Sequence, residues 1–391
     1  MSRTVRRLEL VIRRLLPVVT RRIFRSSSGG PLEAASVRRI LIIRQHNQLG
    51  DMLCVVPLLR ALRASIPGAE IDLLASPVNA DIMRHHCLLD DLLVYDKREY
   101  LGPLGIRIGR VRRLVKDLRA RNYDLVAVPS TVSMSLTSDL LAAVTGAPMR
   151  FGPGSIDGVR NPGASFYSNA VDLDWRSSPT RHQTLRNADL LEGVVEPPED
   201  LSHELTLTAS EIEAAKDEVS RLRQGKAHLV AIHPGAGKPP NRWPARHFAR
   251  LARQLASEMG AAVFATIGPM DQETQQALED DLGKEIEYVV NKPIRTIASI
   301  LSYVDLLVSN DTGIMHVGAA VGVPVISLFG PTEPRQWAPI GPRSRYIQGN
   351  PMSAITVEKV VSLATRMLSE VSTQQRGGGK GGRGLPREHK R

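Results

Sequence analysis

Residues 305–332 read DLLVSNDTGIMHVGAAVGVPVISLFGPT, and this stretch contains two apolar runs separated by a helical segment. The runs at 305–309 and 323–329 are short and nearly continuous, which is typical of strands buried on both faces of a parallel sheet. Between them, the small residues of 313–321 allow a helix to pack closely on that sheet. This β-α-β order predicts a doubly wound α/β fold.

The same alternation of strand and helix occurs in two series along the chain. One series lies between residues 40 and 128, and the other begins at residue 228 and ends with the elements at 305–329 described above. In addition to the elements above, we predict strands at 40–43, 70–75, 124–128, 228–233 and 261–267, and helices at 51–65, 106–121, 245–259, 271–282 and 354–370. Two such series in one chain predict two Rossmann-like doubly wound domains.

Composition suggests where these domains begin and end. A weakly patterned stretch around 193–226 contains Glu196-Pro-Pro-Glu-Asp200 and separates the two series. We therefore expect a basic amphipathic helix and tether at 1–35, Rossmann-like domains at 36–205 and 206–352, a C-terminal helix at 353–372, and a disordered, basic, Gly-rich tail at 373–391.

The formal net charge of +11 resides mostly at the two ends of the 391-residue chain. Residues 1–39 carry +8 and residues 376–391 carry +5, which leaves −2 for the body. A nearly neutral body removes the global argument for nucleic-acid binding, so no nucleic acid is expected as a partner.

Residues 3–25 place apolar side chains on one side of a helix and arginines on the other. This pattern favours a helix that lies on an anionic membrane surface. A helix packed on the protein body, or a wrongly assigned start codon, is the alternative. No run approaches the roughly 18 apolar residues of a membrane span, and Cys54 and Cys87, the only cysteines, fit a reduced cytosolic protein.

Ligands of open α/β sheets bind beyond the carboxyl ends of the strands, where helix N-termini offer free N–H groups. Three such places carry unusual residues: RQHNQLGD at 44–51, HPGAGKPPNRWP at 233–244 and SNDTGIMH at 309–316. The residues alone leave Asp51 open as a plain helix cap. The segment 233–244 lacks the Gly-Lys-Ser/Thr element of a P-loop but suits an anion through its two cations.

Together these motifs resemble glycosyltransferase family nine, the bacterial lipopolysaccharide heptosyltransferases. The resemblance spans about residues 37–372 and includes Leu328-Phe-Gly-Pro-Thr332 and the helix from Val357. It implies the GT-B architecture, in which two Rossmann-like domains face a cleft, the first holding the acceptor and the second the nucleotide sugar.

The resemblance also implies an activity and a location. The activity is inverting transfer of a sugar, with heptose from ADP-heptose as the first candidate, to lipopolysaccharide core or a related lipid-linked glycan. No metal or other cofactor is expected, and the implied location is cytoplasmic, with peripheral attachment to the inner face of the inner membrane.

Roles follow for single residues from the same resemblance. Asp51 matches the family's general base. The nucleotide-sugar site is matched by Asp271 near the ribose, by the backbone of Thr312 and Gly313 at the diphosphate, and by Asp311 and His316, which complete that motif. Where the family commonly has Lys, this chain has Asn241, so either Lys238 or Arg242 is expected to supply the cation. His46-Asn47-Gln48 replaces small hydroxyl residues, which leaves a different sugar or acceptor open.

Two other functions stay open from the sequence: a sugar-nucleotide epimerase of similar fold, and a non-catalytic cationic adaptor for membrane or nucleic acid. Two further motifs are expected to be without function. Asp172-Leu-Asp174 has the spacing of a metal-binding pair, but we expect it in an irregular stretch. Gly152–Gly158 has neither the spacing of a dinucleotide-binding loop nor, by our expectation, a preceding strand.

Overall fold

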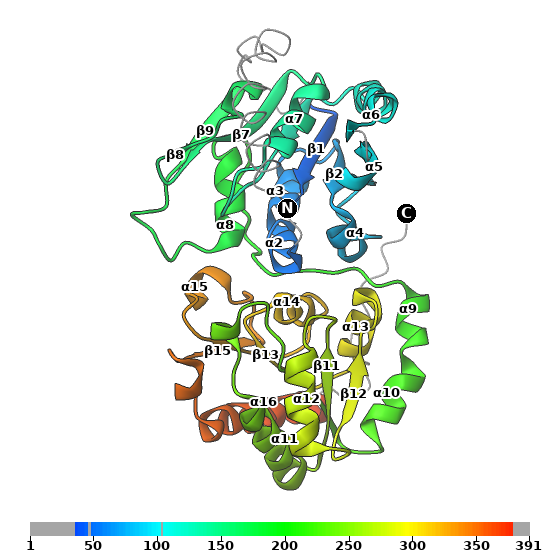
Figure 1. Cartoon of the computed structure of the whole chain (residues 1–391), viewed down its shortest axis with the longest axis vertical. Helices are drawn as coiled ribbons and strands as arrows, with labels where there is room; N and C mark the ends of the chain where they lie inside the picture. The colour runs from blue at the N-terminus through cyan, green and yellow to red at the C-terminus, as the bar shows by residue number, and fades with distance from the viewer. Residues whose placement is uncertain (1–35, 46–47, 103–104, 378–391) are drawn as a thin grey trace. The chain divides into compact units, whose positions relative to one another are not determined.

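The computed structural model describes residues 36–45, 48–102 and 105–377 of the chain (Figure 1). These residues form two compact units. Residues 36–45, 54–80 and 88–201 belong to the first unit, and residues 48–53, 81–87 and 202–377 belong to the second. The amphipathic helix predicted at 3–25 lies outside the described residues.

The first unit is built on a seven-stranded sheet. The sheet has the order β3 (Asp91–Val94), β2 (Glu70–Ala75), β1 (Arg39–Arg44), β6 (Leu125–Ala127), β7 (Met149–Ile156) and β8 (Val159–Arg160), and β9 (Asn169–Leu173) also pairs with β7. All pairings are parallel except that of β7 with β8. In the register of the central strands, Ile42 of β1 lies opposite Leu73 and Ala127.

Helices cover both faces of this sheet. Leu41 and Ile43 of β1 pack in one core cluster with Leu118 and Leu141, while the alternate residue Ile42 is equally buried, as expected for a strand with two covered faces. The helices of this unit are α3 (Val56–Ser65), α5 (Lys97–Tyr100), α6 (Ile108–Ala120), α7 (Leu136–Val144), α8 (Gln183–Ala188), η2 (Ala164–Phe166) and η3 (Asp189–Leu191). The short strands β4 (Leu101–Gly102) and β5 (Gly105–Ile106) pair antiparallel with each other.

The second unit contains a six-stranded, fully parallel sheet. Its order is β12 (Glu287–Val290), β11 (Ala261–Ile267), β10 (His228–His233), β13 (Leu306–Asn310), β14 (Val325–Phe329) and β15 (Ser344–Gln348). Counted along the chain this order is 3-2-1-4-5-6, the order of Rossmann folds. The parallel sheets of the two units confirm the predicted α/β class with two Rossmann-like domains.

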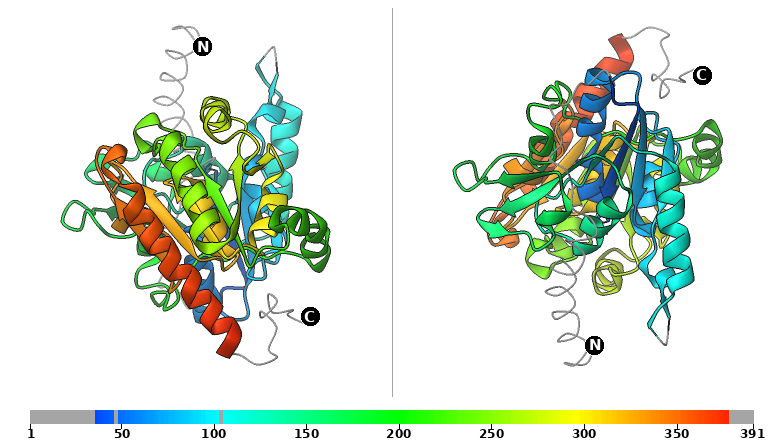
Figure 2. Two further views of the ribbon diagram at one scale, coloured as in Figure 1. Left: turned by 90° about the horizontal axis from the view of Figure 1, so that it is seen from below. Right: turned by 90° about the horizontal axis from the view of Figure 1, so that it is seen from above.

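One face of the second sheet is covered by α11 (Ala245–Met259), α12 (Gln272–Leu282) and α16 (Val357–Gly377), whose apolar side chains form one core with β10, β11 and β13. Helices α11 and α16 lie side by side in this layer (Figure 2). The remaining helices are α2 (Leu49–Leu53), α9 (Ala209–Ala214), α10 (Lys216–Arg223), α13 (Ile294–Leu301), α14 (Gly313–Ala320), α15 (Pro334–Trp337), η4 (Pro239–Asn241) and η5 (Met352–Ala354), and α4 (Pro77–Met83) contains the change between units at residue 80.

The structure corrects three local predictions. The helix predicted at 51–65 is two helices, α2 and α3, because Pro57 at the start of α3 has no N–H to continue the hydrogen-bond ladder. Asp172 lies in strand β9 and not in an irregular stretch. The expected absence of a strand before Gly152 is wrong, because strand β7 begins at Met149 and contains both Gly152 and Gly154.

Candidate functional site

The candidate site lies at the carboxyl ends of β10 and β13 in the second unit. These two neighbouring strands are where the strand order reverses, and their following helices extend to opposite sides, which leaves a crevice for a ligand in folds of this kind. Segment 233–244 follows β10 and segment 311–316 follows β13. The fold therefore brings together two of the three segments that the sequence singled out.

His233 closes the end of β10 and is buried. Its Nδ1 lies 2.9 Å from the carbonyl oxygen of Thr266 and 3.0 Å from the hydroxyl of that residue. Its Nε2 lies 4.0 Å from Oδ2 of Asp271. Burial lowers the pKa of His233 although the Asp271 charge acts in the opposite direction, so the imidazole is neutral at pH 7.

Asp271 precedes α12 and packs against the loop that follows β10. Its Oδ2 accepts a hydrogen bond of 2.9 Å from the backbone N–H of Gly268. A Cβ atom at Gly235 would lie 2.2 Å from the Asp271 carboxyl carbon, so only glycine allows this close approach. The structure thus places Asp271 against the loop that follows β10, and its role at the ribose stays a prediction.

Asn241 holds Asp311 from across the loop. The amide Nδ2 of Asn241 donates to Oδ2 of Asp311 at 2.9 Å and to the hydroxyl oxygen of Thr332 at 3.1 Å. Burial raises the pKa of Asp311, whereas its hydrogen bond with Thr332 and the charge of Lys238 act to lower it. Asn241, which stands where the resemblance led us to expect a lysine, is therefore a neutral donor that holds an acidic side chain.

The two candidate cations have different surroundings. Arg242 donates from Nε to the carbonyl oxygen of Ala236 at 3.0 Å and pairs with Glu273 at 3.1 Å. Lys238 is exposed and forms no ion pair with any residue in the described ranges. Its charge acts to lower the pKa of Asp311, and because it is exposed, Lys238 is the cation more available to a ligand.

Asn310 and Trp243 hold the two segments together. Asn310 donates from Nδ2 to the carbonyl oxygen of Pro234 at 2.8 Å, and its Oδ1 accepts from the backbone N–H of Trp243 at 3.1 Å. The buried indole of Trp243 donates to the carbonyl oxygen of Ile355 at 2.9 Å. Sequence reasoning missed Asn310 and Thr332 as site residues, although Asn310 directly precedes Asp311 and a polar residue ending a buried strand was an available signal.

The N-terminus of α14 points its first-turn N–H groups toward the same edge. Thr312 is the residue before the helix and has an extended backbone, with φ of −159°, and its side chain makes no capping hydrogen bond. A helix N-terminus of this kind favours a negatively charged ligand. The structure therefore places the backbone of Thr312 and Gly313 where an anion can be held.

Helix α2 packs against α14, and this contact explains two glycines. A Cβ atom at Gly50 would lie 2.5 Å from Cδ2 of His316, and one at Gly313 would lie 3.1 Å from Cβ of Leu49. Nδ1 of the buried His316 lies 3.3 Å from Nδ1 of His203. His203 is another residue that the sequence analysis did not identify.

Asp51 lies in α2 and is 4 % exposed. We predicted this residue in the first domain, whereas residues 48–53 belong to the second unit, where Gly50 leaves room for the His316 ring. The structure thus brings Asp51 together with the α14 segment.

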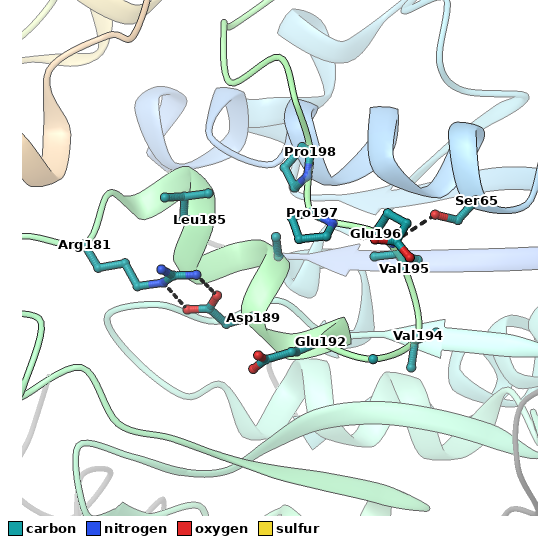
Figure 3. A pocket seen from close by; sticks show the side chains of 12 residues that line it. Ser65, Arg181, Leu185, Asp189, Glu192, Val194, Val195, Glu196, Pro197 and Pro198 are labelled. Carbon is teal, nitrogen blue, oxygen red and sulfur yellow. Dashed lines mark hydrogen bonds and ion pairs between the residues drawn. The ribbon is translucent and has the colours of Figure 1, made fainter.

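A cavity of about 430 Å³ lies elsewhere, within the first unit. It is lined by residues of α8 and η3 and by the segment 192–198 (Figure 3). Arg181 and Asp189 form an ion pair at its wall. Because none of the eight predicted site residues lines this cavity, it is separate from the candidate site.

The carboxylates of Asp172 and Asp174 have other partners. Asp172 accepts a hydrogen bond of 2.7 Å from Ser155, and Asp174 pairs with Arg176, which lowers the pKa of Asp174 to about 2. These contacts give both residues a structural role in and beside β9.

Comparison with known proteins identifies similar chains. The sequence profile of glycosyltransferase family 9 (heptosyltransferase) matches residues 111–365. A curated relative, lipopolysaccharide heptosyltransferase 2 of Salmonella typhimurium, is 27 % identical over 320 residues, which cover 79 % of this chain and 88 % of the relative.

Two solved structures share the fold. A glycosyl transferase family 9 protein from Veillonella parvula superposes with a TM-score of 0.76 at 23 % identity, covering 88 % of this chain and all of that one. The E. coli ADP-heptose lps heptosyltransferase II gives 0.71 at 23 % identity, covering 85 % and 99 %. The predicted GT-B class agrees with these likenesses.

Proposed function

Because the chain belongs to glycosyltransferase family 9 and is a heptosyltransferase-like enzyme, we propose that it transfers heptose from ADP-heptose, with inversion, to lipopolysaccharide core or a related lipid-linked glycan. The relative named above acts on lipopolysaccharide by its name, and one fold neighbour is described as an ADP-heptose enzyme. These likenesses support the donor and the acceptor class.

The leaving diphosphate is proposed to bind at the start of α14. The observation that carries the proposal is the placement of this helix N-terminus and Lys238 at the point where the strand order reverses. Backbone N–H groups of the Thr312–Gly313 turn and the ammonium of Lys238 would hold the charge that grows on the departing nucleoside diphosphate. We propose that this charge makes a metal unnecessary.

Asp51 is proposed as the general base. Its carboxylate would accept the proton of the acceptor hydroxyl as that oxygen attacks the sugar carbon, a contribution of roughly 10²–10⁴-fold to the rate. Gly50 and His316 hold the backbone of α2 against α14. The base and the diphosphate site therefore belong to segments that pack on each other.

Asp271, Asp311 and His316 are proposed to shape the rest of the nucleotide-sugar site. Asp271 would meet the ribose. Asp311, held by Asn241 and Thr332, would position the loop that precedes α14. Arg242, already bonded to Ala236 and Glu273, would order the first loop of the site.

The location follows as part of the proposal. We propose a cytoplasmic enzyme attached to an anionic membrane surface, with residues 3–25 as one attachment point. Among the described residues no helix has the length and apolar character to cross a bilayer.

Product analysis tests this function. The full chain is incubated with ADP-heptose, with and without a lipid-linked glycan that lacks heptose, and products are followed by mass spectrometry. The proposal predicts that the glycan gains one heptosyl unit and that ADP is released. Turnover of the sugar nucleotide without an acceptor would indicate the epimerase alternative, and absence of any turnover with a well-folded protein would favour the adaptor.

A further inference from the structure

Helix α6 of the first unit exposes most of its surface. Leu118 is its one buried residue, and α6 lies next to the short helix α5 (Figure 1). Ile106 and Ile108, at the start of the helix, are 66 % and 62 % exposed. A single exposed apolar side chain is common on protein surfaces, but two large ones close together indicate an interaction site.

The same stretch is strongly basic. Residues 106–121 contain seven cationic residues and a single acidic one, Asp117. At 100° per residue, Arg112, Arg113 and Lys116 lie on the side of the helix opposite Leu118. These three side chains and Arg107 are exposed, and none forms an ion pair within the described part of the chain.

The positive charge of this stretch contrasts with the nearly neutral net charge of the body as a whole. Residues 40–375 carry a net charge of −2, whereas residues 106–121 alone carry +6. An asymmetric distribution of this kind attracts an anionic surface to one side of a protein. Arg110 and Arg121, in contrast, pair with acidic neighbours, so the unpaired cations cluster on the outer side of α6.

We propose that the start and outer side of α6 dock on an anionic lipid bilayer. The isoleucine side chains would enter the interface between headgroups and acyl chains, and the cations would contact headgroup phosphates. We call this the α6 surface, and it consists of Ile106, Arg107, Ile108, Arg112, Arg113 and Lys116.

The exposed isoleucines distinguish a bilayer from a soluble polyanion. A soluble polyphosphate or a nucleic acid would bind the cations but would leave Ile106 and Ile108 in water. A bilayer satisfies both kinds of side chain, because apolar groups insert while long cationic side chains reach the phosphates. The alternation Ile-Arg-Ile at 106–108 therefore favours a lipid surface.

The inference rests on the proposed function in one respect: an enzyme with a lipid-linked acceptor would gain from binding to the bilayer that holds the acceptor. Vesicle binding requires no donor, acceptor or turnover. Failure of docking and failure of heptosyl transfer can therefore be told apart by separate measurements on the same protein.

Depth-dependent fluorescence quenching tests the insertion directly. In the full chain, Ile108→Trp places a reporter on the α6 surface, and Val159→Trp is the matched control because Val159 is 64 % exposed beside the exposed Arg160 on β8. With vesicles of phosphatidylcholine and phosphatidylglycerol, brominated acyl chains should quench the added emission of Ile108→Trp and leave that of Val159→Trp unchanged. Equal quenching of both variants, or of neither, would overturn the proposal.

Charge reversal tests the electrostatic part. Arg113→Glu should lower the fraction of the chain that sediments with these vesicles by at least about fivefold, since each cation near an anionic surface contributes substantially to binding, whereas Arg160→Glu should change it by less than about twofold. Equal losses for the two variants would contradict a specific role of α6. If inorganic polyphosphate binds in an Arg113-dependent manner while Ile108→Trp stays unquenched, the surface recognises a soluble polyanion and the bilayer proposal is wrong.

Discussion

Lys238 and Arg242 are only four positions apart, but their side chains have different surroundings. We therefore predict different roles for them. Lys238 is exposed and its charge acts to lower the pKa of Asp311, whereas Arg242 is bonded to Ala236 and Glu273. We expect Lys238→Ala to weaken ADP binding by about 1–3 kcal/mol, the scale of a lost charge-assisted hydrogen bond. Arg242→Ala should cost less than about 1 kcal/mol of ADP affinity, because its partners are protein groups. Calorimetry with both variants checks this, and the opposite ranking would assign the cation to Arg242.

Asp139 of α7 makes the stability of the first unit depend on pH. It accepts a hydrogen bond from Tyr167, and burial raises its pKa from 3.8 to about 6. Between these values the folded chain holds the proton more firmly than the unfolded chain, so this residue's contribution to the free energy of unfolding falls as the pH rises through that window.

The variant Asp139→Asn isolates this contribution because it keeps the size of the side chain and carries no charge. Relative to the variant, the parent should lose about 1 kcal/mol of stability between about pH 5 and pH 7. Urea unfolding of both proteins at the two pH values measures the difference. A difference that is the same at both pH values would mean that Asp139 titrates normally in the folded chain.

At the scale of elements, the contact between α2 and α14 depends on a glycine. A methyl group at Gly50 would lie 2.5 Å from the His316 ring, so Gly50→Ala must displace that ring or shift α2 against α14. We expect transfer to fall at least about tenfold, since a small displacement of catalytic groups is costly, while ADP affinity changes by less than about threefold.

The matched control is Gly68→Ala, because nothing lies within 4 Å of a Cβ atom at that position and Gly68 lies outside the candidate site. It should keep parent activity within about twofold. Steady-state transfer and ADP calorimetry on both variants decide the matter, and normal transfer by Gly50→Ala would show that the contact is not needed for the reaction.

Some elements could be predicted closely from the sequence and others could not. Strand β10 and helix α11 have the predicted bounds. Both were marked by local signals: a short apolar run for the strand, and for the helix an apolar pattern of helical period that begins after Pro244 and ends at Gly260. Edge strand β3 was missed because its four residues are partly exposed and so lack the apolar run of a buried strand. The split of α2 from α3 was missed although Pro57 was visible.

At the scale of the whole molecule, long-range contacts set the limit of what sequence reasoning can reach. Asn241 meets Thr332 across 91 positions and Asn310 meets Pro234 across 76. No local pattern specifies such pairs, so motifs predicted where the site lies but not which side chains bind each other. The packing of residues 48–53 with the second unit is another contact of this kind.

Residues 3–25 are expected to add to membrane binding. A chain that begins at Ser36 should bind anionic vesicles several-fold more weakly than the full chain, since each arginine near the surface contributes about 1 kcal/mol before screening by salt. Transfer to a soluble acceptor analogue should persist. Vesicle cosedimentation that is unchanged by the truncation would mean that residues 3–25 are a packing element.

We propose that Asp51 acts as the base next to a nucleotide site at the start of α14, and one substitution tests this role directly. Asn retains the size and shape of Asp, so Asp51→Asn should change melting temperature little. We predict that transfer from ADP-heptose falls at least roughly a hundredfold while ADP affinity changes by less than about threefold, the pattern of a lost general base. Rate, ADP affinity and melting curve are measured on one preparation. A well-folded Asp51→Asn protein that keeps most of its transfer activity would contradict the claim.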